Sequence, residues 1–467
     1  MEKFFKLKQN GTNVKTEIMA GIATFMTMAY ILSVNPIILA GDDPGLWNAV
    51  FMATAISSFI GTFIMAVYAN KPFALAPGMG LNAFFASVVA GIAAAQSISY
   101  QEAYAGGLAI VLFSGVLFTV LTIIKVREKI VEAIPKTVRV GIPAGIGLMI
   151  AEIGLDANCQ IYTESGAHTM LNFFIDGPSV TLAKMGDAYP QMVLCVITMV
   201  IGLFTIAVLS HKNVKGSILY GIITGSVVNW IGTFILGGNP FASLATASFV
   251  PPFADMFKYT FLKLNFGTLF NMGWVTLIMT IVSFAMVDMF DTIGTLIGTA
   301  TRAGMVDKDG NMPGLNKAMI SDSIATMAGA CLGTPTVTTF VESATGVEEG
   351  GRTGLTALTV ALLFLSCIFL APVVALIPAA ATSAALIYVG VLMLSAVKGV
   401  NFNDVSQSVP ITLMLLIMPL TGHIGDGIGV GLIAYSIIKT FTGKAKDVSV
   451  LTWVLSALFI VKLFMPY

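Results

Sequence analysis

Long apolar segments recur along this chain, separated by short polar connections. A run of about 18 apolar residues or more can cross the hydrocarbon core of a bilayer as a helix. The pattern predicts fourteen membrane spans, two of them short or broken, at 18–40, 50–69, 76–94, 104–124, 134–153, 190–210, 214–236, 272–301, 316–332, 335–350, 353–377, 381–397, 408–421 and 424–440. A last apolar run, 449–465, follows them. The pattern therefore indicates an all-α polytopic membrane protein.

Two of the predicted spans are interrupted by proline and polar residues. The third opens with Pro77-Gly-Met-Gly-Leu-Asn82, and the tenth contains the stretch GTPTVTTFVESATGVEEG at Gly333–Gly350. Proline removes a backbone donor and disfavours helix just before itself, so each stretch is expected to run extended and then start a half-helix. Irregular backbone at membrane depth is tolerated only where it lines a cavity or is buried in protein.

The two halves of the chain match weakly. Span 1 is similar to span 8, span 5 to span 12, and the interrupted span 3 to the interrupted span 10. Because seven spans is an odd number, the second half is expected to be inserted upside down relative to the first. Paired interruptions in inverted halves are the best sequence indication of a transporter's binding site.

Composition and charge agree with a membrane protein. The 467 residues are 56% hydrophobic and 10% charged, and the formal net charge is zero, so nothing indicates a nucleic-acid partner. The four cysteines lie far apart without a CxxC pair, which suggests neither a metal site nor a disulfide framework. The basic start, residues 1–16, is expected to form an interfacial amphipathic helix rather than a signal peptide.

The distribution of basic residues predicts the orientation. With the N-terminus in the cytoplasm, the fourteen-span assignment puts 20 of the 24 Lys and Arg residues on the cytoplasmic side. Such a bias is typical of multi-pass membrane proteins. We expect the cytoplasmic membrane as the location, and we expect the long outer loops, 154–189 and 237–271, to serve as lids or packing elements.

Three of the carboxylates within predicted spans are candidates for the functional site: Asp288 and Asp291 in span 8 and Glu342 in span 10. A carboxylate at this depth is costly unless it faces a wet cavity or a partner, so it indicates a functional site. No basic residue is predicted at the same depth, and burial without a cation favours the protonated form of a carboxylic acid. We expect one of them to bind substrate and one of the set to exchange a proton; the alternative is a polar residue satisfied by neighbouring helix backbone.

Other polar groups are expected near these carboxylates. Asn82 offers a donor and an acceptor that suit a hydrogen-bonding heterocycle, although it could instead cap its helix. Candidates for the wall opposite span 8 are Tyr30, Asn35 and Pro36. Asp322 could tie span 9 to its neighbours. No Walker loop, HExxH, GxSxG or nucleotide-binding fingerprint occurs in a usable context, so neither coupling to ATP nor a cofactor is indicated.

Four motifs in order, MAGIATFMTMAYILSVNP, FALAPGMGLNAFF, FDTIGTLIGTA and GTPTVTTFVESATGV, resemble the AzgA-like purine permeases of the nucleobase–ascorbate transporter superfamily. The resemblance runs from about residue 15 to 442. It implies a seven-plus-seven inverted repeat with a core domain and a gate domain. The implied divisions are 17–124 and 272–377 for the core, 125–236 and 378–441 for the gate, 237–271 for an outer loop, and 442–467 for a C-terminal apolar segment.

The resemblance also implies proton-coupled import of hypoxanthine, guanine or adenine by an elevator-type motion. It places the base between spans 3 and 10, held by Asp291 and Glu342, with Asn82 at the polar position of span 3. The backbone at Met79-Gly80-Leu81 and at Val341 would meet the acceptors of the base. Aspartate at the span 8 position, where the uracil and xanthine branch has glutamate, leaves room for a bicyclic base.

Alternatives remain at this stage. An anion exchanger on the same architecture would use the helix N-termini of spans 3 and 10. A membrane-embedded enzyme would use the carboxylates as metal ligands or acid–base groups, but no histidines stand at ligand spacing. A passive channel is a third alternative. The expected partners are a purine nucleobase, protons and the lipid bilayer, with a homodimer considered for the assembly.

Overall fold

The computed structural model describes residues 2–40, 43–124, 134–156, 158–163, 166–242, 244, 248–302, 305–306, 312–422 and 424–463. Within these ranges, eleven helices are long and apolar enough to cross a membrane, and further shorter apolar helices occur. Each predicted span contains a helical segment, although the tenth, 335–350, is helical only over the short stretch Ser343–Glu348. The prediction of an all-α polytopic membrane protein is confirmed.

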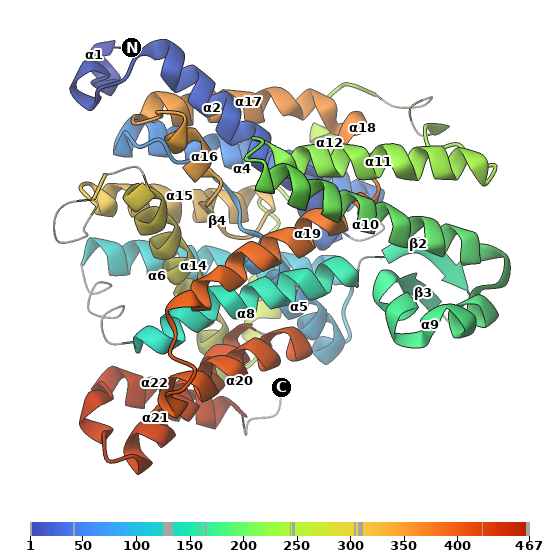
Figure 1. Ribbon diagram of the computed structural model, residues 1–467. Helices are drawn as coiled ribbons and strands as arrows, with labels where there is room; N and C mark the ends of the chain where they lie inside the picture. Colours follow the sequence, from blue (N-terminus) through green and yellow to red (C-terminus); the bar gives the residue numbers. More distant parts are fainter. Residues whose placement is uncertain are drawn as a thin grey trace.

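A first group of helices packs together from both halves of the chain (Figure 1). It contains α2 (Val14–Met28), α3 (Ile31–Ala40), α4 (Pro44–Ile64), α5 (Met79–Gln96), α6 (Tyr100–Ile123), α14 (Trp274–Arg302), α15 (Leu315–Leu332), α16 (Ser343–Glu348) and α17 (Gly354–Ser366). In this group α15 packs against α4 and α6, and α17 packs against α2 and α4.

A second group is centred on α8 and α19, which lie side by side in Figure 1. It contains α8 (Lys136–Leu155), α10 (Tyr189–His211), α11 (Ser217–Ile235), α19 (Ala379–Leu394), α20 (Val405–Thr421), α21 (Ile424–Phe441) and α22 (Val450–Leu463). The division into a core domain and a gate domain, and the movement of one against the other, stay predictions.

Two predicted spans are interrupted by strands. β1 (Leu75–Pro77) precedes α5, and β4 (Val337–Thr339) precedes the short α16. Span 1 is also divided, since α2 and α3 are separated at Ala29 and Tyr30. Backbone polar groups inside a membrane must be satisfied within the protein. The pairing of β1 with β4 meets part of that requirement.

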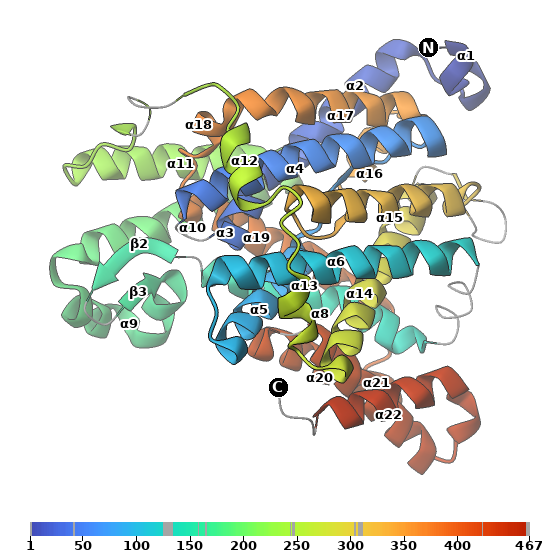
Figure 2. The same ribbon diagram turned by 180° about the vertical axis from the view of Figure 1, so that it is seen from behind.

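The long loops contain secondary structure of their own, and the N-terminus differs from the expectation. Residues 154–189 contain an antiparallel hairpin of β2 (Asn158–Thr163) and β3 (Gly166–Thr169), followed by α9 (Met170–Met185), at the right of Figure 1. In Figure 2, the view from behind, α12 (Phe253–Tyr259) and α13 (Phe266–Phe270) cross in front of α4 and α6. The N-terminus is not one amphipathic helix: α1 (Glu2–Phe5) and a 3-10 turn end at Gly11, which has a φ of 66°.

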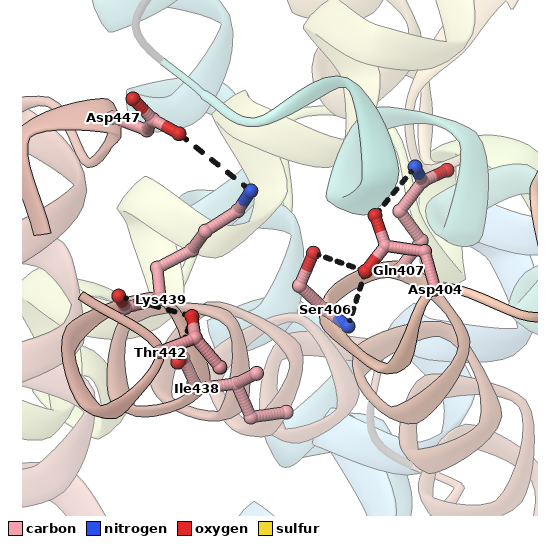
Figure 3. Close-up of polar contacts among 7 residues, drawn as sticks. All are labelled: Asp404, Ser406, Gln407, Ile438, Lys439, Thr442 and Asp447. Atoms are coloured by element: carbon pink, nitrogen blue, oxygen red, sulfur yellow. Dashed lines mark hydrogen bonds and ion pairs between the residues drawn. The ribbon is translucent and has the colours of Figure 1, made fainter. Parts of the chain in front are cut away.

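The C-terminal apolar run forms α22, which lies beside α21 in both views of the molecule (Figures 1 and 2). Phe459 of α22 covers Gly429 of α21, and the hydroxyls of Ser436 and Ser456 lie 3.0 Å apart. Figure 3 shows the polar ends of this region, where Lys439 lies 3.7 Å from Asp447. α22 is therefore packed against the helix that precedes it.

Candidate functional site

The interrupted spans meet in a short antiparallel sheet inside the first helix group. β1 and β4 pair with Ala76 opposite Thr338 and Pro77 opposite Val337. The ladder continues beyond the strands, because the Gly78 N–H donates to Thr336 O over 3.0 Å. Two segments that are about 260 residues apart in the sequence thus pair, and because the pairing is antiparallel, α5 begins beyond one end of the sheet and α16 beyond the other.

Gly78 directly follows β1 and packs against Thr338 of β4. It is the N-cap of α5, with φ −73° and ψ 123°. A Cβ atom on Gly78 would lie 2.6 Å from Thr338 Cγ2 and 3.9 Å from Asp291 Oδ2. Glycine is therefore required here by space rather than by backbone conformation, and the first turn of α5 lies directly beside Asp291.

Asp291 comes from the middle of α14 and is only partly buried. The described residues give its carboxylate no hydrogen-bond partner and no ion pair. A carboxylate beside a helix N-terminus, without a protein partner, is available to accept N–H groups from a ligand.

Glu342 ends the polar stretch after β4 and is the residue before α16. Its Oε1 accepts a hydrogen bond of 2.7 Å from Tyr30 Oη. Tyr30 lies at the break between α2 and α3. The interruption of span 1 thus supplies a hydroxyl that orients the Glu342 carboxylate.

Asn82 and Asn35 form a buried amide pair. Asn82 Nδ2 donates to Asn35 Oδ1 over 2.6 Å, and Asn35 Nδ2 donates to Thr54 and Thr334 over 2.7 and 2.9 Å. Both asparagine side chains are fully buried. Asn82 Oδ1 has no hydrogen-bond partner among the described residues. The structure therefore places Asn82 one turn into α5, linked to span 1, with one acceptor unused.

Two other carboxylates tie α14 and α15 to β4. Asp322 of α15 is fully buried and accepts hydrogen bonds from Thr292 Oγ1 at 2.8 Å, Thr339 N at 2.9 Å and Thr339 Oγ1 at 3.0 Å. The expectation that Asp322 ties span 9 to its neighbours is confirmed. Asp288, also fully buried, accepts from Thr326 Oγ1 at 3.2 Å. Asp288 thus contacts α15, whereas Asp291 contacts the start of α5.

The expected backbone contacts lie at the two helix starts. Met79, Gly80 and Leu81 form the first turn of α5, and their N–H groups have no acceptor within the helix. A Cβ on Gly80 would lie 2.2 Å from Ile146 Cγ2 of α8, so this turn packs closely on the second helix group. The Val341 side chain is 47% exposed beside Glu342.

The sequence analysis did not single out the threonines that organise the site. The hydroxyls of Thr292 and Thr338 lie 2.9 Å apart and join α14 to β4, and Thr334 holds Asn35. Four threonines within the six residues 334–339, around Pro335, were a visible signal, but their partners are distant in the sequence. Within the described residues, no group of three or more His, Cys, Asp or Glu side chains could hold a metal ion.

Comparison with known proteins decides the family. The model of a permease family, Xan_ur_permease, matches residues 15–430. The chain belongs to this family. The motifs that resembled nucleobase permeases lie within the matched range, and the prediction of family is confirmed.

Several curated permeases are similar over almost their whole length. The adenine permease AdeQ of Escherichia coli is 39% identical over 99% of this chain and 96% of its own length. The guanine/hypoxanthine permease PbuO of Bacillus subtilis is 39% identical over 98% of this chain and 99% of its own length. This permease is therefore a multi-pass membrane transporter and not an enzyme, as predicted.

The fold is also found in solved transporters. The transmembrane domain of the cyanobacterial bicarbonate transporter BicA has a TM-score of 0.59, with 16% identity over 91% of this chain and 97% of that domain. At this identity the likeness shows the fold alone. It supports a transporter membrane domain as the architecture of this permease.

Proposed function

We propose that this permease is a purine nucleobase:proton symporter that imports hypoxanthine, guanine or adenine. The observation that carries the proposal is the pair of carboxylates, Asp291 and Glu342, at the paired strands where α5 and α16 begin. Neither makes an ion pair with a basic side chain of the described residues. The names of the similar adenine and guanine/hypoxanthine permeases support a purine as the substrate.

Purine recognition would divide between donors and acceptors. Ring and exocyclic N–H groups of the base would donate to the carboxylates of Asp291 and Glu342. Ring nitrogens and carbonyl groups would accept from backbone N–H groups of Met79–Leu81 and from that of Val341. Hydrogen bonds to charged groups contribute about 1.5–3 kcal/mol each. Asn82 would act on the first turn of α5 from its buried pair with Asn35.

Proton coupling would use the repulsion between these carboxylates. Two carboxylates that share a site resist being ionised together, so one of them gains a proton more readily. A proton taken up by Glu342 or Asp291 would accompany the base and leave with it. Asp288 is the third candidate, although its hydrogen bond from Thr326 also gives it a structural role.

Movement would occur between the two helix groups. The site is built mostly by the first group, and the second group contacts it through α8, at Ile146. We propose an elevator-type motion of a core, 17–124 and 272–377, against a gate, 125–236 and 378–441. The charge distribution supports a cytoplasmic N-terminus in the cytoplasmic membrane. A homodimer is the assembly we expect for the gate.

An anion exchanger is the alternative on the same fold. The fold likeness to a bicarbonate transporter does not carry its substrate to this chain. An anion would be repelled by Asp291 and Glu342, and these residues have no ion pair with a described cation. The site chemistry therefore favours a ligand that donates hydrogen bonds.

Uptake into proteoliposomes tests the proposal. Labelled hypoxanthine, guanine and adenine would be offered with and without an inward proton gradient. We expect gradient-driven accumulation of at least one base by the wild type, and loss of coupled uptake in Glu342→Gln and Asp291→Asn. Asp187→Asn, an exposed aspartate after α9, is the matched control. Wild-type coupled uptake in both site variants would refute the roles of the two carboxylates.

A further inference from the structure

A cavity of about 420 Å³ lies between the two helix groups, apart from the carboxylate site. The first group contributes α3, the start of α4 and the middle of α5, and the second contributes the end of α8 and the start of α19. Residues that define its chemistry are Trp47, Ser87, Glu152, Ile153, Asp156 and Thr382. Cavities that bind small molecules have volumes of about 300–1,000 Å³. This one is large enough for a bicyclic base.

The side chains that line the cavity offer hydrogen-bond acceptors. Glu152 and Asp156 lie one helical turn apart at the end of α8, and the described residues give the Glu152 carboxylate no hydrogen-bond partner. The hydroxyls of Ser87 and Thr382 donate to Phe84 O and Ala379 O over 2.8 and 2.9 Å. Their protons are thus used, so only their lone pairs face a ligand. None of the lining residues is basic.

The remaining walls are apolar and suit a flat ring. Ile153 and Leu386 stand on the side of the second group, and Ile37 and Trp47 on the side of the first. The Trp47 ring stacks on Phe51 at 5.6 Å with an interplanar angle of 6°, which holds it in place. A hydrated cation would lose water against such walls, whereas a heteroaromatic ring would bury its faces there.

The cavity is displaced along α5 from the carboxylate site. The lining on α5 begins at Ala83, two residues or about 3 Å after Leu81, and reaches Ser87, six residues or about 9 Å after it. Neither Asp291 nor Glu342 lines the cavity, so a base at its Ser87 end and a base at the carboxylates could be bound separately. In the proposed orientation the end of α8 faces outward, so a base that enters from outside would meet the cavity first.

We propose that this cavity is a second nucleobase site, in which the Glu152 carboxylate accepts an N–H of the incoming purine before it reaches Asp291 and Glu342. The proposal rests on the proposed function. The walls of the cavity come from both helix groups. Movement of one group against the other would therefore change the shape of the cavity and pass the base inward.

Equilibrium binding to the purified full-length permease tests for the second site. Labelled adenine, guanine and hypoxanthine are the probes. We expect the double variant Asp291→Asn, Glu342→Gln to retain weak purine binding. Adding Glu152→Gln should weaken that residual binding about five- to tenfold, since a charged acceptor is lost. The proposal would be overturned if Glu152→Gln left the residual affinity unchanged, or if the double variant bound no purine.

Transport supplies an independent measurement. In an otherwise wild-type chain, Glu152→Gln should raise the KM for uptake about fivefold with the maximal rate within about twofold. Ser87→Phe, which fills the cavity, should slow uptake while membrane abundance and the size-exclusion profile stay as in the control Asp187→Asn. Wild-type kinetics in both cavity variants would overturn the second nucleobase site and leave the proposed function unaffected. Failure of the wild type to bind or transport any purine would overturn the proposed function as well.

Discussion

Tyr30 donates a hydrogen bond of 2.7 Å to Glu342 Oε1, and it does so from the break between two helices of the first span. The two residues are 312 positions apart in the sequence. The contact joins the interruption of span 1 to the interruption of span 10. It means that the orientation of the main substrate-binding candidate depends on the first span of the chain.

Removal of this hydroxyl in Tyr30→Phe should weaken purine uptake. A hydrogen bond to a charged group contributes about 1.5–3 kcal/mol, and a carboxylate in a wet site can replace part of it with water. We therefore expect the KM to rise about five- to tenfold, with protein abundance unchanged. Tyr220→Phe, on an exposed face of α11, is the matched control and should behave as wild type. An unchanged KM in Tyr30→Phe would show that the hydroxyl does not orient the site.

A single methyl group at Gly78 should disrupt the strand pair. In Gly78→Ala the new Cβ would lie 2.6 Å from Thr338 Cγ2, closer than non-bonded carbon atoms allow. The backbone conformation of Gly78 suits alanine, so the effect would come from crowding alone. We expect purine binding to fall about fivefold or more, because overpacking of this kind costs about 1–3 kcal/mol.

A second substitution separates crowding from other causes. Thr338→Ser removes the Cγ2 atom and keeps the hydroxyl that faces Thr292. The double variant Gly78→Ala, Thr338→Ser should therefore recover most of the binding. Gly91→Ala, later in α5 with no atom within 4 Å of the new Cβ, should leave binding unchanged. Equal losses in the single and the double variant would contradict the steric explanation.

The sequence predicted the broken spans because proline, glycine and threonine at membrane depth have few stable alternatives. Residues Pro77 and Pro335 mark both interruptions, and paired interruptions imply one shared site. The sequence alone could not separate the roles of Asp288 and Asp291. At a spacing of three residues the two carboxylates lie on neighbouring helix faces. Only tertiary packing sends one to Thr326 and the other to Gly78.

Asn82 and the outer cavity show a second limit of the sequence. A polar residue in the first turns of a half-helix can face a ligand or a neighbouring span. The local sequence around the residue is the same in both cases. Asn82 faces the neighbouring span because Asn35, 47 residues earlier, lies within hydrogen-bonding distance of it. Glu152 likewise stands near the predicted end of span 5, where a carboxylate is unremarkable until α3, α5 and α19 close a cavity around it.

The start of α20 carries a pH-dependent cap (Figure 3). The Asp404 carboxylate accepts from Ser406 Oγ at 2.8 Å, Ser406 N at 2.9 Å and Gln407 Nε2 at 3.1 Å. These hydrogen bonds, those from Ser406 first, hold the pKa of Asp404 below its ordinary value of 3.8. A lowered folded-state pKa stabilises the folded protein above the unfolded pKa, and that contribution is lost as the pH falls through the folded pKa.

Asp404→Ala should therefore lower the melting temperature at pH 7, and the difference from wild type should shrink as the pH falls below about 4. Asp404→Asn keeps a capping oxygen, so its loss at pH 7 should be smaller than that of alanine. Thermal unfolding of the purified permease in detergent, followed by tryptophan fluorescence from pH 3.5 to 8, measures both. A difference between Asp404→Ala and wild type that does not depend on pH would exclude the charge as its source.

An ion pair between Lys215 and Glu349 joins the two helix groups. Lys215 precedes α11, Glu349 follows α16, and their side chains are 51% and 30% exposed. The same region packs closely, because a Cβ on Gly216 would lie 3.5 Å from Met26 Cε of α2. The pair stabilises the arrangement in which these ends touch. Ion pairs at such exposure contribute about 0–1 kcal/mol, and salt screens them.

If the groups move against each other during transport, Lys215→Gln should change the maximal uptake rate by up to about fivefold, and raised ionic strength should reproduce the effect in the wild type. The charge swap Lys215→Glu, Glu349→Lys should restore the wild-type rate, whereas each swap alone should not. Lys184→Gln is the matched control, since Lys184 pairs with Asp176 inside α9 at similar exposure. Rates that stay at the wild-type value in Lys215→Gln and in both single swaps would show that opening this contact does not limit transport.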